Sequence, residues 1–221
     1  HITENTKAIV VTNIFGHPAK LKKLKEIADA KSIYLIEDNA QAPMAKEYER
    51  FCGTVGHIGV LSFNYHKHIH TGEGGACITN DFNLASKMQL LRNHAEAVIE
   101  KSEKKYLVNM IGSNFRMTEL QAALGIAQCI NIKKHINERV ELAEYLTDIV
   151  KDLPGIMPPK VRDKCSHVYY CWGFKIKKNI LGISRKRFSD ALLAEGFPHS
   201  IGYIKPLYLL PIFQKKIAMG E

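Results

Sequence analysis

The amino-acid sequence predicts an α/β fold in which a mostly parallel β-sheet is flanked by helices. A β-branched apolar run at residues 9–14 indicates a buried strand, and a second apolar run at residues 33–38 indicates another. An amphipathic helical pattern lies between them. A strand, a helix and a strand joined by short connections form a βαβ unit, whose two strands lie parallel.

The helix between these strands is expected to begin at Pro18, because proline in the first helical position loses no hydrogen bond. Leu21, Leu24, Ile27 and Ala28 recur at helical spacing and would form its apolar face. The lysines of the same segment fall on the opposite face. This pattern therefore predicts a helix packed on one side of the sheet.

Two further strands are expected at residues 58–63 and 76–79, separated by a polar loop that contains glycines. Residues 81–94 have helical spacing of apolar side chains. Thr118 and Gln121 form a capping box before a long helical pattern, which reaches about Leu153.

The chain then changes character at Pro154 and Gly155, which end the long helix. Residues 166–177 predict a strand, and residues 185–197 predict a short helix closed by Gly196. We therefore expect residues 1–153 to be part of a large domain and residues 154–221 to be the beginning of a small C-terminal domain.

Composition narrows the function only slightly. The 221 residues are 46% hydrophobic and 24% charged, which is typical of globular proteins, and the net charge is +9. The basic residues are scattered and do not alternate with aromatic ones, so neither nucleic acid nor a membrane is expected as a partner. Five cysteines without metal-ligand spacing indicate reduced thiols and a cytoplasmic location.

Asp38 and Lys67 follow two of the predicted parallel strands. Ligands of open α/β sheets bind at the carboxyl ends of such strands. A carboxylate at a buried strand end needs a cationic or hydrogen-bonding partner, and a protonated pyridine nitrogen is one such partner. A helix cap or a salt bridge to a lysine is the alternative, and spacing alone does not exclude it.

Lys67 lies in the segment SFNYHKHIHTGEGG, between an apolar strand and a glycine-rich turn. A lysine that forms an imine must be shielded enough for its amine to be neutral, and such a setting can provide this. Ser62 could donate its hydroxyl to a phosphate. The alternative for Lys67 is a solvated surface charge, as for most of the 31 basic residues.

This segment has two other interpretations. His66, His68 and His70 alternate, so on a strand they would share one face as metal ligands. No acid or cysteine joins them at ligand spacing, and no metal is expected. The TGEGG glycines lack the Lys-Ser/Thr ending of a P-loop, which excludes that motif.

The sequence resembles the DegT/DnrJ/StrS family of nucleotide-sugar aminotransferases that depend on pyridoxal phosphate (PLP). The resemblance covers nearly the whole chain and rests on four motifs in order: FGHPA at residues 15–19, EDNAQA at 37–42, SFNYHKHIHTGEGG at 62–75 and NFRMTELQAALG at 114–125. Weaker matches are RNH at 92–94, HVYY at 167–170 and PLYLLPIF at 206–213.

The resemblance implies an aspartate-aminotransferase-like fold (PLP fold type I) and pyridoxal 5′-phosphate as cofactor. It assigns Lys67 to the Schiff base and to proton transfer. Asp38 would pair with the pyridine nitrogen, Gln41 would lie near the phenolic oxygen, and Ser62 would bind the phosphate. Asn114 would reach the phosphate of the cofactor held by a partner subunit, which implies a homodimer with shared active sites.

The implied reaction moves an amino group from glutamate to a nucleotide-linked keto-sugar, for cell-surface polysaccharide or amino-sugar biosynthesis. Dehydratase relatives carry histidine where this chain has Lys67, so transamination is favoured here. A PLP-dependent keto-sugar dehydratase and a truncated, regulatory relative without catalysis are the alternatives.

The chain also departs from the family pattern. Asn39 replaces the usual alanine of the acidic motif, with little effect expected. The chain begins at what resembles the middle of the large domain, so the family's Gly-Thr phosphate clamp and stacking aromatic ring are not in it, and a fragment of a longer enzyme is expected. His94, Tyr203 and Lys205 are candidate substrate contacts, for which a structural role is equally open.

Overall fold

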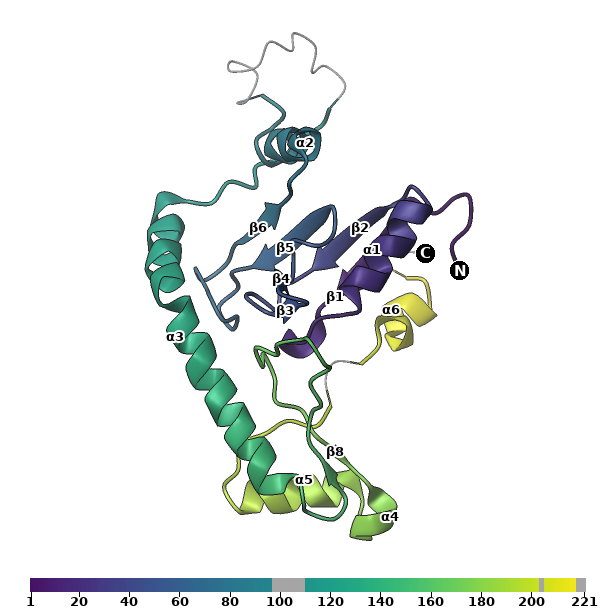
Figure 1. Ribbon diagram of the computed structural model, residues 1–221, viewed down its shortest axis with the longest axis vertical. Helices are drawn as coiled ribbons and strands as arrows, with labels where there is room; N and C mark the ends of the chain where they lie inside the picture. The colour runs from purple at the N-terminus through teal and green to yellow at the C-terminus, as the bar shows by residue number, and fades with distance from the viewer. Residues whose placement is uncertain (97–109, 203–204, 218–221) are drawn as a thin grey trace. The chain divides into compact units, whose positions relative to one another are not determined.

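The computed structural model describes residues 1–96, 110–202 and 205–217 (Figure 1). The chain forms two compact units. The first contains residues 1–151 and 158–173, and the second contains residues 152–157 and 174–221. Within the described ranges, no helix is long and apolar enough to cross a membrane.

The main sheet has the strand order β1-β2-β5-β6. Its strands are β1 (Ala8–Thr12), β2 (Tyr34–Asp38), β5 (Ile58–Ser62) and β6 (Gly75–Ile78). The first three are parallel, as predicted, whereas β6 pairs antiparallel with β5. Asp38 stands in register with Thr12 on one side and Val60 on the other, so the carboxyl ends of three strands meet at one edge.

Helix α1 (Leu21–Ala30) packs with β2, and its Leu21 and Ala28 are fully buried. The expectation that it begins at Pro18 is wrong. The carbonyl oxygens of Pro18 and Ala19 accept hydrogen bonds from the guanidinium of Arg162 at 2.8 Å each, so they take no part in a first helical turn.

The rest of the first unit contains a one-turn 3-10 helix, a short hairpin and two helices. These are η1 (Ile14–Gly16), β3 (Lys46–Glu47) with β4 (Arg50–Phe51), α2 (Phe82–Arg92) and α3 (Glu119–Val150). Asp81 caps α2 by accepting from two backbone N–H groups. The capping box of Thr118 and Gln121 is confirmed at the start of α3.

The second unit is smaller. It contains the antiparallel pair β7 (Ile156–Met157) and β8 (Lys175–Ile176), followed by α4 (Lys178–Leu181), α5 (Arg185–Ala194), η3 (Leu207–Leu209) and α6 (Pro211–Gln214). The backbone N–H of Lys177 donates to the carbonyl of Gly155 at 2.8 Å and extends the contact between the two strands.

The domain boundary differs from the expected division at residue 153. Residues 158–173 return to the first unit, although the sequence placed them in the second. Most of the strand predicted at 166–177 is irregular, and only β8 forms. The reason is that Ser166 and Val168 donate their N–H groups to Lys46 and Gly16 of the first unit rather than to a strand of the second.

The hydrophobic core of the first unit has two clusters of buried side chains. One contains Leu21, Ala42, Ala45, Cys52, Val55, Ile136 and Val168, and the other contains Ala28, Ile33 and Leu35. The larger cluster takes members from α1, α3, the segment after β2 and the returning segment 158–173. Apolar burial thus fixes these four parts around the sheet edge where the predicted site residues lie.

Candidate active site

The end of β2 is held by a buried carboxylate, that of Glu37. Its oxygens accept from the backbone N–H groups of Gly53 at 2.6 Å, Val55 at 2.8 Å and Gly56 at 2.6 Å, and the side chain is fully buried. A buried carboxylate is tolerated only when it is hydrogen-bonded in this way. Glu37 therefore fixes the loop after β4 against β2 and makes the strand end rigid.

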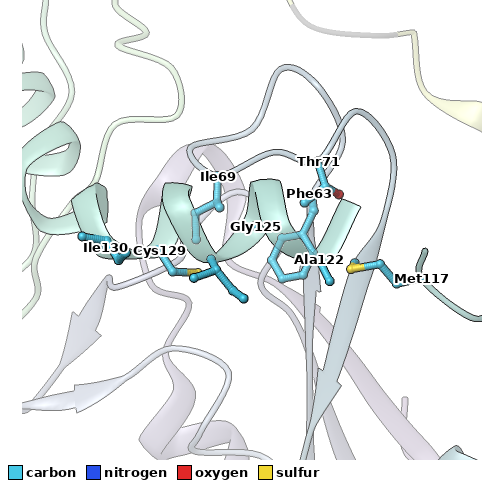
Figure 2. A pocket seen from close by; sticks show the side chains of 9 residues that line it. Phe63, Ile69, Thr71, Met117, Ala122, Gly125, Cys129 and Ile130 are labelled. Carbon is cyan, nitrogen blue, oxygen red and sulfur yellow. The ribbon is translucent and has the colours of Figure 1, made fainter. Parts of the chain in front are cut away.

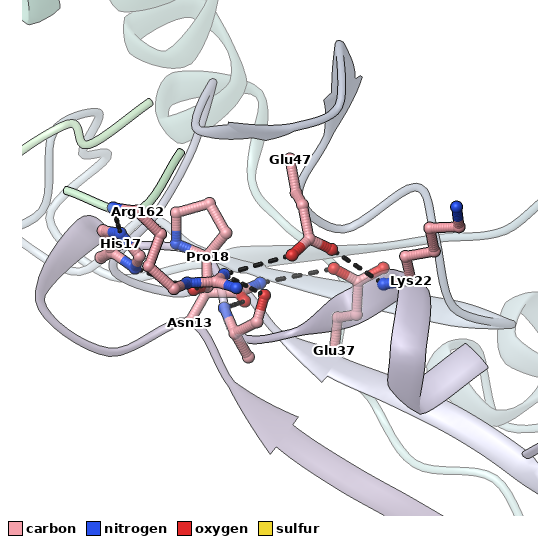
Figure 3. A network of polar contacts seen from close by, with 8 residues as sticks. Asn13, His17, Pro18, Lys22, Glu37, Glu47 and Arg162 are labelled. Atoms are coloured by element: carbon pink, nitrogen blue, oxygen red, sulfur yellow. Dashed lines mark hydrogen bonds and ion pairs between the residues drawn. The ribbon is translucent and has the colours of Figure 1, made fainter. Parts of the chain in front are cut away.

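Asn13 extends this network to β1 (Figure 3). Its amide nitrogen donates to Glu37 at 3.3 Å and to Asn39 at 3.1 Å, while its oxygen accepts from the N–H of Ala19 at 2.8 Å. Asn39 in turn donates to the carbonyl of Cys52 at 3.0 Å and is only 1% exposed. The family departure at Asn39 is therefore a buried link between two strand ends.

Arg162 anchors the returning segment to the same network. Besides its bonds to Pro18 and Ala19, it forms an ion pair with the buried carboxylate of Glu47 at 3.2 Å. Its backbone N–H donates to Nε2 of His17 at 3.1 Å, so Nδ1 of that ring carries the proton and donates to the carbonyl of Pro18 at 2.8 Å. Burial lowers the pKa of His17, which favours this neutral form.

Asp38 is the last residue of β2 and is half-buried. Its Oδ1 accepts from the N–H of Ala40 at 3.1 Å, which is the one hydrogen bond of this carboxylate within the described residues. Ala40 is not in a helix, and the described ion pairs do not include Asp38. Neither a helix cap nor a lysine salt bridge therefore accounts for this acid.

Gln41 lies beside it and is 6% exposed. Its side-chain oxygen accepts from the N–H of Phe15 at 2.7 Å. Phe15 has a left-handed backbone with φ of 59°, and its carbonyl accepts from the N–H of Cys171 at 3.4 Å. Gln41 thus connects the EDNAQA motif to the end of β1 and, through Phe15, to the returning segment.

The loop between β5 and β6 carries Lys67. Its neck is closed by two backbone bonds, from Phe63 to the carbonyl of Gly74 at 2.8 Å and from Thr71 to the carbonyl of Phe63 at 2.9 Å. The N–H of Lys67 donates to the carbonyl of Asn64 at 3.0 Å, which turns the chain at the tip. The lysine is half-buried, so the alternative of a fully solvated surface charge does not describe it.

Ser62 ends β5 immediately before this loop. Its hydroxyl oxygen accepts from the N–H of Asn64 at 3.3 Å. A hydroxyl that accepts in this way keeps its own hydrogen for another acceptor. Ser62 can therefore donate to a ligand oxygen at the mouth of the lysine loop.

The three alternating histidines do not share one face of a strand. The segment is not a strand, and His66 is exposed while His68 is buried and donates from Nε2 to the carbonyl of Val168 at 2.9 Å. Burial lowers the pKa of His68 to about 4, so the ring is neutral at pH 7. Among the residues that the structure describes, no three metal-binding side chains gather in one place.

Among the described residues, no hydrogen bond joins Asn114 to the other four predicted residues. Asn114 is exposed, it forms an isolated bridge with Asn93, and its side chain accepts from the N–H of Arg116 at 3.2 Å. Of the candidate substrate contacts, His94 has a left-handed backbone with φ of 57° and Lys205 is exposed in the second unit. Tyr203 lies outside the described residues.

An apolar pocket of about 520 Å³ lies behind the lysine loop (Figure 2). One wall is formed by Phe63, Ile69 and Thr71 of the loop, and the other by α3 residues that include Gly125 and Cys129. Because its lining is almost entirely apolar, it does not match an anionic cofactor.

Sequence reasoning missed the contact of Lys67 with an aromatic ring. The Nζ atom of Lys67 lies 4.8 Å from the ring centroid of Tyr170. The HVYY match contains Tyr170, but no spacing in the sequence links it to the lysine. Glu37 was noticed only as a member of its motif, although it carries more hydrogen bonds than Asp38.

The chain is similar to known transaminases and aminotransferases. The UDP-4-amino-4,6-dideoxy-N-acetyl-beta-L-altrosamine transaminase of Helicobacter pylori is 32% identical, over 97% of this chain and 56% of that protein. An aminotransferase from Psychrobacter cryohalolentis superposes with a TM-score of 0.88 at 29% identity, over 97% of this chain and 59% of that one.

A structure of the E. coli GDP-4-keto-6-deoxy-D-mannose-3-dehydratase with bound hydrated PLP also superposes, with a TM-score of 0.75 at 29% identity. It covers 88% of this chain and 53% of the dehydratase. The chain thus spans about half the length of the relatives it matches. The predicted fold is confirmed as part of a PLP fold type I domain.

The family profile that matches residues 1–220 is that of the DegT/DnrJ/EryC1/StrS aminotransferases. The match includes all four motifs and both compact units. The chain belongs to the DegT/DnrJ/EryC1/StrS aminotransferase family.

Proposed function

We propose that the protein is a PLP-dependent aminotransferase that moves an amino group from glutamate to a nucleotide-linked keto-sugar. The observation that carries the proposal is the placement of Lys67. Its amine lies on a closed loop directly after β5, beside the strand whose end bears Asp38 and Gln41. Family membership and the PLP-bound dehydratase relative support the same cofactor.

The residues of this chain fit pyridoxal phosphate. The cofactor has a basic ring nitrogen, an aldehyde, a phenolic oxygen and a phosphate, and when bound it supplies an electron sink. Asp38 offers a carboxylate without an ion pair among the described residues, and this carboxylate would hold the ring nitrogen in its protonated form. Ser62 would donate its hydroxyl to the phosphate, and Gln41 would lie near the phenolic oxygen.

Lys67 would hold the cofactor covalently and then move a proton between substrate carbon and cofactor. A primary amine can perform both tasks, whereas an imidazole at the same position can only transfer protons. A dehydratase on the same scaffold is the second candidate, favoured by the structural match to the E. coli enzyme. The primary amine at position 67 favours transamination over dehydration.

The proposed substrate class is supported by the names of the relatives. The H. pylori protein is named for a UDP-linked amino sugar, and the E. coli dehydratase for a GDP-linked keto-sugar. A nucleotide-linked keto-sugar is therefore the proposed acceptor, glutamate is the proposed donor, and cytoplasmic synthesis of amino sugars for surface polysaccharides is the proposed role.

We also propose a homodimer in which Asn114 serves the cofactor of the partner subunit. Within the described residues no contact joins Asn114 to Lys67 or Asp38, and its side chain is exposed. Apolar side chains on α3 are exposed as well, with Leu120 at 86% and Ile130 at 77%. Exposed apolar side chains of this kind are typical of surfaces that are covered in an assembly.

The direct test is transfer of ¹⁵N from labelled glutamate to a nucleotide-linked 4-keto-6-deoxy sugar by the natural protein that contains this chain. Lys67→Ala should abolish transfer. Lys87→Ala, which removes an exposed lysine of α2, should leave it unchanged. Transfer that survives in Lys67→Ala would overturn the role of the lysine, and loss of the sugar's hydroxyl without ¹⁵N incorporation would favour the dehydratase.

A further inference from the structure

The Lys67 amine rests over an aromatic ring. Its Nζ lies 4.8 Å from the ring centroid of Tyr170, within the range in which a cation is attracted to the face of a ring. Tyr170 belongs to the returning segment, which lies far from Lys67 in the sequence but in the same compact unit. The contact therefore depends on how that segment is held.

Two backbone bonds and one side-chain bond hold the segment around Tyr170. Val168 donates to the carbonyl of Gly16 at 2.9 Å, Cys171 donates to the carbonyl of Phe15 at 3.4 Å, and the carbonyl of Tyr169 accepts from the guanidinium of Arg139 at 3.4 Å. Gly16 lets the backbones approach closely, because a Cβ there would lie 2.8 Å from the nitrogen of Tyr170.

A fourth bond ties the segment directly to the lysine loop. His68, the neighbour of Lys67, donates from Nε2 to the carbonyl of Val168, two residues before Tyr170. The buried Nδ1 of His68 has no hydrogen-bond partner among the described residues. A buried nitrogen without a partner costs free energy, so burying this ring is unfavourable unless its other nitrogen forms a useful bond. The bond from Nε2 to Val168, which fixes the lysine loop, is consistent with such a role.

We propose that Tyr170 is a positioning residue for Lys67, whose ring face holds the protonated amine beside the cofactor site whenever that amine is not bound to cofactor. This inference rests on the proposed function. The aromatic face carries a partial negative charge, so it favours the charged amine over the neutral one. The ring would retain the amine while it carries a proton and release it when the proton leaves.

Several other groups lie near Lys67 and Tyr170 and affect the electrostatic environment of the amine. The rings of His66 and His68 each lie 6.1 Å from that of Tyr170, and burial raises the pKa of the neighbouring Cys171 thiol, which keeps it neutral. The guanidinium of Arg139 is the nearby fixed positive charge. Substitution of Tyr170 alone leaves all of these groups in place.

Competitive acetylation without cofactor tests the contact in the natural protein. The rate at Lys67 is measured against that of Lys87 within the same sample, for wild type, Tyr170→Leu and Tyr170→Phe. Tyr170→Leu should raise the relative rate at Lys67 about fivefold at pH 8, because the neutral amine is the reactive form. Tyr170→Phe keeps a ring face and should stay within about twofold of wild type.

The pH profile separates this role from simple unmasking of the lysine. The difference between the leucine and phenylalanine variants should shrink as the pH rises above the ordinary lysine pKa of about 10.4, because the neutral form then prevails in both variants. A constant difference would mean that access had changed rather than charge, and it would overturn the proposal. Equal rates in all three proteins would overturn it too.

His68→Phe provides a second variant in case Tyr170→Leu fails to fold. It removes the bond to Val168 while leaving the ring of Tyr170, so the relative rate at Lys67 should rise by an intermediate factor. A parallel sample reduced with borohydride in the presence of PLP separates the two claims. Label on Lys67 together with unchanged acetylation contradicts only the role of Tyr170, whereas no label in wild type contradicts the proposed function itself.

Discussion

Two loops flank β5, one before it and one after it, and they are stabilised in opposite ways. The loop at residues 52–57 is fixed by Glu37, a fully buried carboxylate that accepts three backbone N–H groups. The lysine loop at residues 63–74 is closed at its neck by two backbone bonds and is tied to the returning segment by His68, and Lys67 at its tip rests against a ring. The backbone N–H groups of the first loop are hydrogen-bonded within the protein. The second loop carries Lys67, which is proposed to bind the cofactor.

The two acids at the end of β2 show the same division. Glu37 has its oxygens occupied by the protein, while the carboxylate of its neighbour Asp38 accepts one hydrogen bond within the described residues. Adjacent residues of a strand point to opposite faces, so Glu37 serves the framework while Asp38 points to the other face and is the proposed cofactor ligand. The difference in hydrogen bonding distinguishes structural acids from candidate cofactor ligands.

Glu37→Ala should produce the largest loss of stability, about 4 kcal/mol, because it leaves buried N–H groups without acceptors. Asp38→Ala is the matched control, and its single bond to Ala40 predicts a loss of about 1 kcal/mol. Urea unfolding measures both. Equal losses of stability for the two variants would contradict the conclusion that Glu37 is structural and Asp38 is not.

Asn39→Ala should cost about 2 kcal/mol, because Asn13 and the carbonyl of Cys52 both lose a buried partner. Asn83→Ala, at an exposed position of α2, should change the free energy of unfolding by less than about 0.5 kcal/mol. A change as small as that of Asn83→Ala would contradict this prediction. It would show that position 39 matters little for stability, as expected from the sequence.

Acidification should act mainly through His68 and His167. Burial lowers the pKa of each to about 4 in the folded protein, whereas an unfolded histidine has a pKa of about 6.5. Between these values the unfolded state binds more protons, so stability falls as the pH drops below 6.5. Each histidine should contribute a loss of roughly 1–2 kcal/mol at pH 5.

Urea unfolding at pH 7 and pH 5 measures this loss, and His68→Gln should reduce it. Glutamine retains a side-chain donor for the carbonyl of Val168 but does not titrate. An unchanged pH dependence in His68→Gln would show that this histidine is not held neutral by burial.

Local patterns in the sequence predicted the sheet and its ligand edge. The apolar runs located the strands to within a few residues, and Asp38, Gln41, Ser62 and Lys67 lie at or just after the ends of β2 and β5. These features depend on short-range periodicity and chain order, which a single sequence contains. The roles of these residues toward a cofactor stay predictions.

The remaining features depend on contacts between distant segments. The start of α1 is one of them, because the guanidinium of Arg162 donates to the carbonyl oxygens of Pro18 and Ala19 and the helix begins only after them. The return of residues 158–173 to the first unit, and with it the Tyr170 contact, likewise rests on bonds to Gly16 and His68. No local periodicity encodes such pairings, because tertiary contacts override strand propensity.

The most direct measurement is to incubate the natural protein with PLP, reduce it with borohydride and locate the modified residue by peptide mass spectrometry. The account predicts label on Lys67, and no label there in a folded Lys67→Ala variant whose free energy of unfolding is close to wild type. Label on another lysine, or an unlabelled Lys67 in a protein that retains bound cofactor, would contradict it.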